Sequence, residues 1–249
     1  MSVDATAAER ALIWHDVECG SYSGDLELWR ELAVVARSGR VLELGCGTGR
    51  VALILARAGH GVTGLDHDAI LAAELARRAR SEGLPVDAVA ADARDFHLGR
   101  RFGLVVAPMQ LVHLLGGPEG RRSMLRCAAE HLTPSGRIAV ALLSGDATSV
   151  PHASPPLPDV VERDSWVYSS LPLEVRRLPG ALEVRRLRQA VSPAGDLSEE
   201  LDVTRLDALT APEFESEALE SGLRPVERLE VAETADHVGS TVVVLEVGS

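Results

Sequence analysis

VLELGCGTGR, residues 41 to 50, carries the most informative pattern in the sequence. A short apolar run leads into three glycines at every second position, Gly45, Gly47 and Gly49, and Glu43 lies two residues before the first of them. Glycine has no side chain and tolerates left-handed backbone, so a strand followed by this loop predicts a turn that a ligand approaches closely. The neighbouring segments must identify the ligand.

Strand-like and helical segments alternate around this loop. Short apolar runs predict five strands, and amphipathic periods that end at glycine predict helices between them. Such alternation is typical of an α/β protein with a doubly wound, mostly parallel sheet. The predicted strands are 40–44, 60–66, 86–92, 102–109 and 137–143, and the predicted helices are 24–39, 50–59, 68–83 and 118–132.

The pattern changes after residue 143. A proline-containing connection precedes segments that alternate or carry β-branched residues, which predicts antiparallel strands. The hexamer LEVRRL occurs at 173–178 and at 182–187 around Pro-Gly-Ala, which predicts a hairpin. We expect an N-terminal helical lid at 1–39, a cofactor-binding core at 40–145, an inserted antiparallel β cap at 146–209, and a helix (210–223) and two strands (224–231, 240–247) that complete the core at 210–249.

Composition narrows the partners and the compartment. The 249 residues are 46% hydrophobic and carry a net charge of −12, so nucleic acid is not expected as a partner. The three cysteines share no CxxC or metal-ligand spacing, so neither disulfides nor a metal are expected. We expect no secretory signal, because the first residues are acidic and alanine-rich, and no window reaches about 18 consecutive apolar residues. We expect a cytoplasmic protein that does not contact a membrane.

The glycine spacing separates classes of nucleotide ligand. A dinucleotide fingerprint is GxGxxG, but Arg50 stands at its third glycine, and a phosphate loop needs a lysine, which the sequence lacks. Asp66 and Asp92 end the next two predicted strands. A carboxylate about 20 residues after the glycines can accept both ribose hydroxyls, and one a strand further can accept an adenine amine. These residues describe an adenosine site without a pyrophosphate, unless each Asp merely caps a helix.

ELGCGTG at 43–49, followed by GLD and then AD at the next two strand ends, resembles the class I S-adenosylmethionine-dependent methyltransferases of the small-molecule type. The resemblance covers 40–145. It implies a Rossmann-like methyltransferase fold with a seven-stranded sheet in the order 3-2-1-4-5-7-6, strand seven antiparallel. It also implies S-adenosylmethionine as cofactor, S-adenosylhomocysteine as product, and a lid in which an aromatic residue, Tyr22 or Trp14, closes over the cofactor.

The resemblance also implies roles for single residues. The glycine loop passes the methionyl part of the cofactor, Glu43 lies near its amine, Asp66 holds the ribose, and Asp92 with Ala93 borders the adenine. Cys46 is better explained as a small filler than as a nucleophile, because nothing in its surroundings would activate a thiol. The expected cofactor contacts are Tyr22, Glu43, Gly45, Cys46, Gly47, Gly49, Asp66, His67, Asp92, Ala93 and Met109.

The chemistry then points to the acceptor side of the site. A sulfonium methyl is already activated, so the enzyme must mainly place a nucleophile in line, which is worth roughly 7–11 kcal/mol. A general base adds about 10²–10⁴ in rate. His113, beyond the fourth strand, and His15, in the lid, are the candidate catalytic bases; a packing role and a surface position are the respective alternatives. Asp146 and His152 are weaker candidates for substrate contact.

We expect methyl transfer to an oxygen or nitrogen atom of a small-molecule metabolite or natural product. Exposed edges of the cap leave a homodimer open. A fold does not determine a function, so a protein that binds the cofactor as a cyclase, scaffold or regulator stays an alternative. A dehydrogenase would instead be stabilised by NAD, and a protein-binding module with a relic pocket would bind neither ligand.

Overall fold

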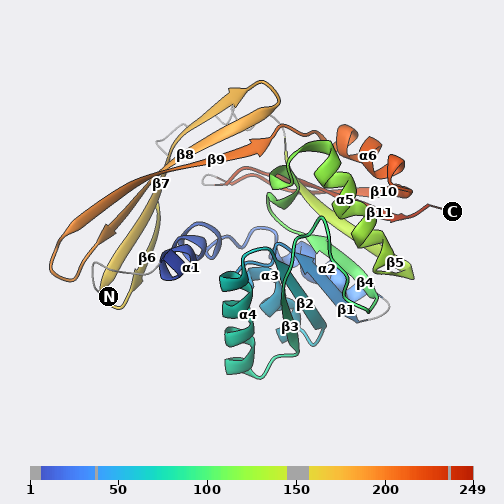
Figure 1. Ribbon diagram of the computed structural model, residues 1–249, viewed down its shortest axis with the longest axis horizontal. Coiled ribbons are helices and arrows are strands. Elements are labelled where there is room, and N and C mark those ends of the chain that lie inside the picture. The colour runs from blue at the N-terminus through green and yellow to red at the C-terminus, as the bar shows by residue number, and fades with distance from the viewer. Residues whose placement is uncertain (1–6, 37–38, 145–156, 235–236, 249) are drawn as a thin grey trace.

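A seven-stranded sheet forms the core of the protein, and a four-stranded sheet is inserted between two of its strands (Figure 1). The computed structural model describes residues 7–36, 39–144, 157–234 and 237–248. The core strands are, in spatial order, β3 (Val86–Ala90), β2 (Gly61–Asp66), β1 (Arg40–Leu44), β4 (Phe102–Ala107), β5 (Leu132–Leu143), β11 (Ser240–Val247) and β10 (Leu223–Val231). β11 runs antiparallel to both neighbours, so the predicted fold class and the order 3-2-1-4-5-7-6 are confirmed.

Helices cover both faces of this sheet because its strands carry apolar residues on both sides. In β1, Val41 packs into one apolar cluster, whereas Leu42 and Leu44 pack into the other. The first cluster lies against α2 (Leu26–Val35), α3 (Arg50–Arg57) and α4 (Ala69–Glu82), and the second against α5 (Gly117–Glu130) and α6 (Ala211–Glu220). This two-sided burial is typical of a doubly wound sheet.

The inserted sheet contains β6 (Asp159–Arg163), β7 (Trp166–Leu178), β8 (Ala181–Val191) and β9 (Leu197–Asp207), all antiparallel. Leu178 pairs with Ala181 across a Pro-Gly turn in which Gly180 has φ of +70°, so the predicted LEVRRL hairpin is confirmed. One face of this sheet packs through Tyr168 and Ala190 on α1 (Ala7–Cys19). Figure 1 shows α1 lying between the inserted sheet and the core.

Three strand ends differ from the predicted ones by two residues or more. β3 ends at Ala90 and β4 at Ala107, two residues earlier than expected, so the residues after them lie in loops at the carboxyl edge of the sheet. β5 begins at Leu132 instead of residue 137, with a register shift against β4 where a turn was predicted. Apolar periodicity locates strands well, but their ends depend on pairing with neighbours far away in the sequence.

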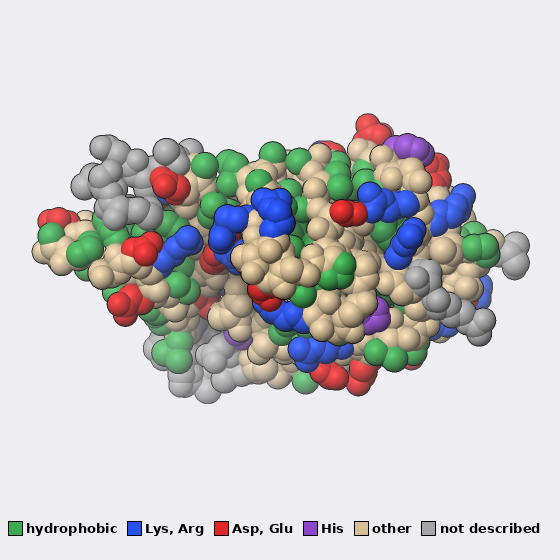
Figure 2. Space-filling view, turned by 90° about the horizontal axis from the view of Figure 1, so that it is seen from below, with side chains coloured by type: hydrophobic (Ala, Val, Ile, Leu, Met, Phe, Trp, Pro, Cys, Tyr) green, Lys and Arg blue, Asp and Glu red, His purple; other side chains and the backbone are tan. Residues whose placement is uncertain are grey.

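Ion pairs between arginine and carboxylate are frequent on the surface. On the face shown in Figure 2, basic side chains lie in separate groups among acidic and apolar ones. The pair of Arg50 and Asp25 differs because it is buried, with 9% and 4% of the two side chains exposed. The guanidinium makes two hydrogen bonds of 2.5 and 2.8 Å to Asp25, which also accepts the indole N–H of Trp29.

Among the described residues, no helix is long and apolar enough to span a membrane.

Replacing Asp25 by Ala should destabilise the protein strongly, because it leaves the Arg50 cation buried without its carboxylate partner and with the Tyr22 carbonyl as a neutral acceptor. We expect a loss of about 3–5 kcal/mol in the free energy of unfolding. Urea titration measures it as a lower midpoint at unchanged slope. Glu82→Ala, which breaks the exposed pair with Arg57, is the matched control and should change the midpoint little. Equal midpoints for the two variants would contradict the assignment.

Candidate cofactor and acceptor site

The glycine loop between β1 and α3 has left-handed backbone at all three glycines, with φ of +66°, +52° and +102° for Gly45, Gly47 and Gly49. Side chains could not be accommodated there. A Cβ atom on Gly45 would lie 3.0 Å from Leu111 Cδ1, and one on Gly47 would collide with the imidazole of His15. The loop therefore exposes backbone in a cradle lined by the protein's own side chains.

Asp66 holds this loop in place. Its Oδ2 accepts the N–H of Gly47 at 2.8 Å, and its Oδ1 accepts the N–H of Asp68 at 2.9 Å. Asp68, rather than Asp66, is the N-cap of α4, since its side chain accepts the N–H of Ile70. The helix-capping alternative thus fails for Asp66, whose two oxygens retain lone pairs for further donors. His67 beside it is mostly exposed, with Nδ1 3.3 Å from Asp66 Oδ1.

Asp92 and Ala93 lie at the same edge of the sheet. The N–H of Ala91 donates to the carbonyl of Asp66 at 2.9 Å, which brings the end of β3 beside the end of β2. Asp92 accepts the N–H of Arg94 and pairs with its guanidinium at 2.7 Å, and this hydrogen bonding holds the pKa of the Asp92 carboxyl below its ordinary value. An adenine amine would share that carboxylate with Arg94.

Glu43 is the most unusual acidic group in the described part of the chain. Its side chain is fully buried below the glycine loop, and Oε2 has no hydrogen-bond partner there. Burial raises the pKa of Glu43 to about 8. Arg50 opposes this shift, but its guanidinium is committed to Asp25. An orphaned buried carboxyl beside a backbone cradle suits a cationic ligand, because a positive charge would satisfy Oε2 and favour ionisation.

Cys46 lies in the glycine loop, and Met109 lies in the loop that follows β4. The N–H of Cys46 donates to the carbonyl of Leu65, and a Cβ on Gly64 would lie 3.0 Å from Cys46 Sγ, so the thiol fills space between two strand ends. Burial raises the pKa of this thiol, which keeps it protonated and argues against a nucleophile. Met109 follows β4 with φ of +55°, a backbone conformation that non-glycine residues rarely adopt.

His15 on α1 lies directly over the glycine loop. Its Nδ1 is 3.3 Å from the Thr48 hydroxyl, which donates to Asp16 Oδ1 at 2.8 Å. Because that hydroxyl proton is directed to Asp16, a neutral ring donates from Nδ1 and leaves a lone pair on Nε2. Burial lowers the pKa of His15, so the ring stays neutral near pH 7. The roles of Thr48 and Asp16 were not predicted, since their contact joins segments 32 residues apart.

The two aromatic candidates for the lid lie elsewhere. The guanidinium carbon of Arg50 lies over the ring of Tyr22, 5.2 Å from the ring centroid. The Tyr22 ring also packs beside His237. Trp14 points to the inserted sheet and meets Tyr168 edge-on at 5.8 Å. His15, and neither Tyr22 nor Trp14, therefore covers Gly47 in this structure. Closure by Tyr22 stays a prediction.

His113 does not have the geometry of a general base. It is 2% exposed, its Nδ1 lies 2.8 Å from the carbonyl of Asp207, and its Nε2 accepts the N–H of Leu143 at 3.1 Å. Both ring nitrogens are thus used by the backbone, so the packing alternative explains this residue better than the expected catalytic role. Asp146 and His152 lie outside the described residues.

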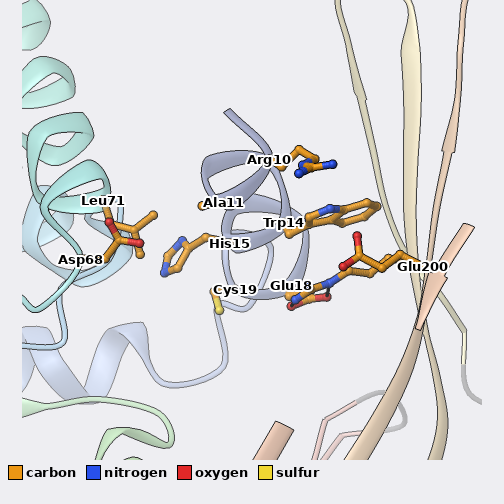
Figure 3. Close-up of a pocket in the computed structure, with 10 residues that line it drawn as sticks. Arg10, Ala11, Trp14, His15, Glu18, Cys19, Asp68, Leu71 and Glu200 are labelled. Atoms are coloured by element: carbon orange, nitrogen blue, oxygen red, sulfur yellow. Dashed lines mark hydrogen bonds and ion pairs between the residues drawn. The ribbon is translucent and has the colours of Figure 1, made fainter. Parts of the chain in front are cut away.

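A cavity of about 550 Å³ opens between α1, the start of α4 and the inserted sheet. Figure 3 shows His15 pointing from α1 toward Asp68 and Leu71, whereas Trp14 and Glu18 point toward the strands. His15 thus belongs both to this cavity and to the covering of the glycine loop. The lining residues are Arg10, Ala11, Trp14, His15, Glu18, Cys19, Asp68, Leu71, Arg188 and Glu200.

Comparison with known proteins agrees with this geometry. Residues 41–136 match a family model described as "Methyltransferase domain". A S-adenosylmethionine-dependent methyltransferase from Clostridium acetobutylicum ATCC 824 superposes with a TM-score of 0.74 at 13% identity, covering 97% of this chain and 98% of that one. The CcbJ methyltransferase from Streptomyces caelestis gives 0.69 at 25% identity, covering 92% of each chain. The sugar N-methyltransferase KedS8 from Streptoalloteichus sp. ATCC 53650 gives 0.72 at 22% identity, covering 97% and 94%. No curated protein matches the chain.

The sheet order and the cradle define a Rossmann-like methyltransferase fold. Residues 41–136 match a methyltransferase domain, and the fold is that of the class I S-adenosylmethionine-dependent methyltransferases. The cofactor of this class is S-adenosylmethionine. The sulfonium and the ammonium of that cofactor are both cationic, which fits the orphaned oxygen of Glu43.

The buried Glu43 should make stability depend on pH. In the unfolded chain it ionises near pH 4.5, whereas in the folded protein it stays protonated up to about pH 8. The folded state then holds the extra proton, so stability falls as pH rises through this window and levels off above it. Glu43→Gln should remove this fall, and urea titration from pH 5 to 9 without ligand measures it. The exposed Glu27→Gln serves as control; parallel curves for wild type and Glu43→Gln would refute the assignment.

Proposed function

We propose that the protein transfers the methyl group of S-adenosylmethionine to a nitrogen or oxygen atom of a small polar acceptor held in the 550 Å³ cavity. The observation that carries this proposal is the position of His15. Its ring lies over Gly47 in the cofactor loop and also lines the cavity, so the two ligand sites share one wall. Such contact is needed because transfer requires the nucleophile and the methyl group to be adjacent.

The cofactor would be held by groups already in place. When bound, S-adenosylmethionine supplies a methyl group on a positively charged sulfur, which is activated for displacement. The glycine loop offers backbone without side chains, and Glu43 offers a buried carboxyl for positive charge. Asp66 has lone pairs for the ribose hydroxyls, and Asp92 accepts the adenine amine. These roles extend the expectations from the sequence and are tested below.

The acceptor side is rich in hydrogen-bonding groups. Three carboxylates and two guanidinium groups line the cavity together with the indole of Trp14. Arg188 is paired with Glu18 at 2.7 Å and stacks over Trp14 at 5.5 Å, which leaves Asp68 and Glu200 to bind donors on the acceptor. This lining suits a hydroxyl-rich compound with an amine. The resemblance in fold to KedS8, a sugar N-methyltransferase, supports an amino sugar or sugar-bearing natural product as the acceptor.

His15 is the proposed general base. Asp16 and Thr48 orient the ring so that Nε2 carries the lone pair, and the lowered pKa keeps that nitrogen unprotonated near pH 7. It can then take the proton that an ammonium or hydroxyl acceptor loses. The inserted sheet and α1 act as cap and lid that exclude water from the cavity, following the expected division at residues 39, 145 and 209.

The cofactor site is tested by ligand-induced stabilisation. S-adenosylhomocysteine at 100 times its dissociation constant should stabilise the folded protein by about 2.7 kcal/mol, seen as a rise in melting temperature. Asp66→Ala should lose this rise, because the loop loses the acceptor for the Gly47 N–H. Asp87→Ala, an exposed carboxylate on β3, is the matched control and should keep it. A rise with NAD alone would instead support the dehydrogenase alternative.

Turnover tests the reaction itself. Purified protein is incubated with S-adenosylmethionine and a panel of amino sugars and hydroxylated analogues, and S-adenosylhomocysteine formation is measured. We expect turnover with amines, reduced about 10²–10⁴-fold in His15→Ala. His97→Ala, at an exposed histidine outside the site, should retain activity. Binding of S-adenosylhomocysteine without turnover on any acceptor would favour the non-methylating alternative.

A further inference from the structure

The chain passes between the core and the inserted sheet at a buried junction. It leaves the core at Leu143, the last residue of β5, and returns after Asp207, the last residue of β9. His113, in the 3-10 helix η1 (Leu111–Leu114), contacts both points. Its Nδ1 lies 2.8 Å from the Asp207 carbonyl, and the Leu143 N–H donates to Nε2 at 3.1 Å. One imidazole therefore ties the outgoing and the returning segment together.

These two bonds define the protonation state of the ring. A carbonyl only accepts, so Nδ1 must carry a hydrogen, and a backbone N–H only donates, so Nε2 must be unprotonated. The junction therefore requires the neutral Nδ1–H tautomer. A proton on Nε2 would place two N–H groups against each other at Leu143 and open the outgoing segment.

Charged groups from three elements surround His113. Arg121 of α5 forms a two-pronged pair with Glu217 of α6 at 2.6 and 2.7 Å. Arg121 also reaches Asp207 Oδ2 of β9 at 3.0 Å, and the N–H of Gly117 donates to the same oxygen at 2.6 Å. Burial and the Arg121 cation lower the pKa of His113, whereas Asp207 opposes them. The return point of the chain is thus anchored to both helices.

The same short helix also touches the cofactor loop. Leu111, two residues before His113, packs on Gly45, where an added Cβ would lie 3.0 Å from Leu111 Cδ1. The N–H of His113 bonds to the Gln110 carbonyl at 3.0 Å, which keeps this segment tight. η1 therefore contacts the glycine loop through one residue and the junction through another.

α1 depends on where the inserted sheet lies. Asp16 binds the core through Arg78 at 2.5 Å, and Glu18 binds the inserted sheet through Arg188 and Ser170 at 2.7 and 2.8 Å. The helix can keep both sets of bonds only while the sheet and the core hold their relative position. Movement at the junction would therefore loosen α1, which lies over Gly47 through His15.

We infer that His113 is a positioning residue, whose neutral imidazole fixes the inserted sheet relative to the glycine loop and so holds α1 over the cofactor site. Its protonation releases the outgoing segment at Leu143 and loosens α1 in turn. This inference rests on the proposed function only in taking the inserted sheet as a wall of the acceptor cavity.

His131 provides a matched control within the same chain. It is also 2% exposed, its Nδ1 lies 2.7 Å from the Cys127 carbonyl, and its Nε2 accepts the Leu98 N–H at 3.0 Å. The ring thus has the same two kinds of backbone bond, but both partners belong to the core. A substitution there removes equal bonding without touching the junction.

Hydrogen–deuterium exchange by mass spectrometry tests the inference on the full chain at pH 7. We expect His113→Leu to lower protection in α1 about tenfold or more, since two buried hydrogen bonds are lost and the effect travels through the inserted sheet. His131→Leu should leave α1 unchanged and affect only its own surroundings. His113→Asn, whose amide N–H can lie where Nδ1 lies, keeps the bond to Asp207 and should restore part of the protection. Local effects confined to Leu143 and η1, or equal loosening of α1 by His131→Leu, would overturn the inference.

In the wild-type protein, a change of pH tests the same inference without a substitution at His113. Protection factors for α1, corrected for intrinsic exchange, should fall as pH is lowered from 8 to 5, and the fall should be absent in His113→Asn. A fall of the same size in both proteins would overturn the inference, because other groups would then cause it. Titration of each variant with S-adenosylhomocysteine separates the two hypotheses: wild type that does not bind it contradicts the proposed function, whereas the exchange data judge His113 independently.

Discussion

The hydrogen bond from the Gly47 N–H to the Asp66 carboxylate is the interaction on which the site depends. It joins the loop after β1 to the end of β2, and Ala91 extends the connection to β3. Three parallel strands thereby present their carboxyl ends as one surface, which is the position at which open α/β sheets bind ligands. Left-handed glycines, the buried Glu43 and the ring of His15 are arranged around that bond.

Sequence patterns were sufficient for the core because its strands are buried on both faces and its helices have one apolar stripe. The hairpin of the inserted sheet was predictable for a local reason, namely a Pro-Gly turn between two copies of the same hexamer. The glycines, Glu43, Asp66 and Asp92 were predicted from spacing along the chain, and the structure places them around the carboxyl ends of neighbouring strands.

The histidines show where such reasoning stops. His113 and His15 both follow patterns that permit a base, and only their partners distinguish them. Those partners, Asp207 for one and Thr48 for the other, lie 94 and 33 residues away in sequence. Tertiary hydrogen bonds of this separation have no local signal, so neither the tautomer of a ring nor the direction in which it points can be read from neighbouring residues. The direction of Trp14 has no local signal for the same reason, since its ring is packed against Tyr168 of the inserted sheet.

The two ends of the insertion meet at a single imidazole, and this has a consequence for how the protein can vary. A segment whose ends lie together can be lengthened, shortened or exchanged without displacing the strands on either side of it. The core sheet carries the glycine loop and its carboxylates, whereas two lining residues of the cavity, Arg188 and Glu200, come from the insertion. Acceptor preference can therefore diverge between relatives of this chain while the cofactor machinery stays the same.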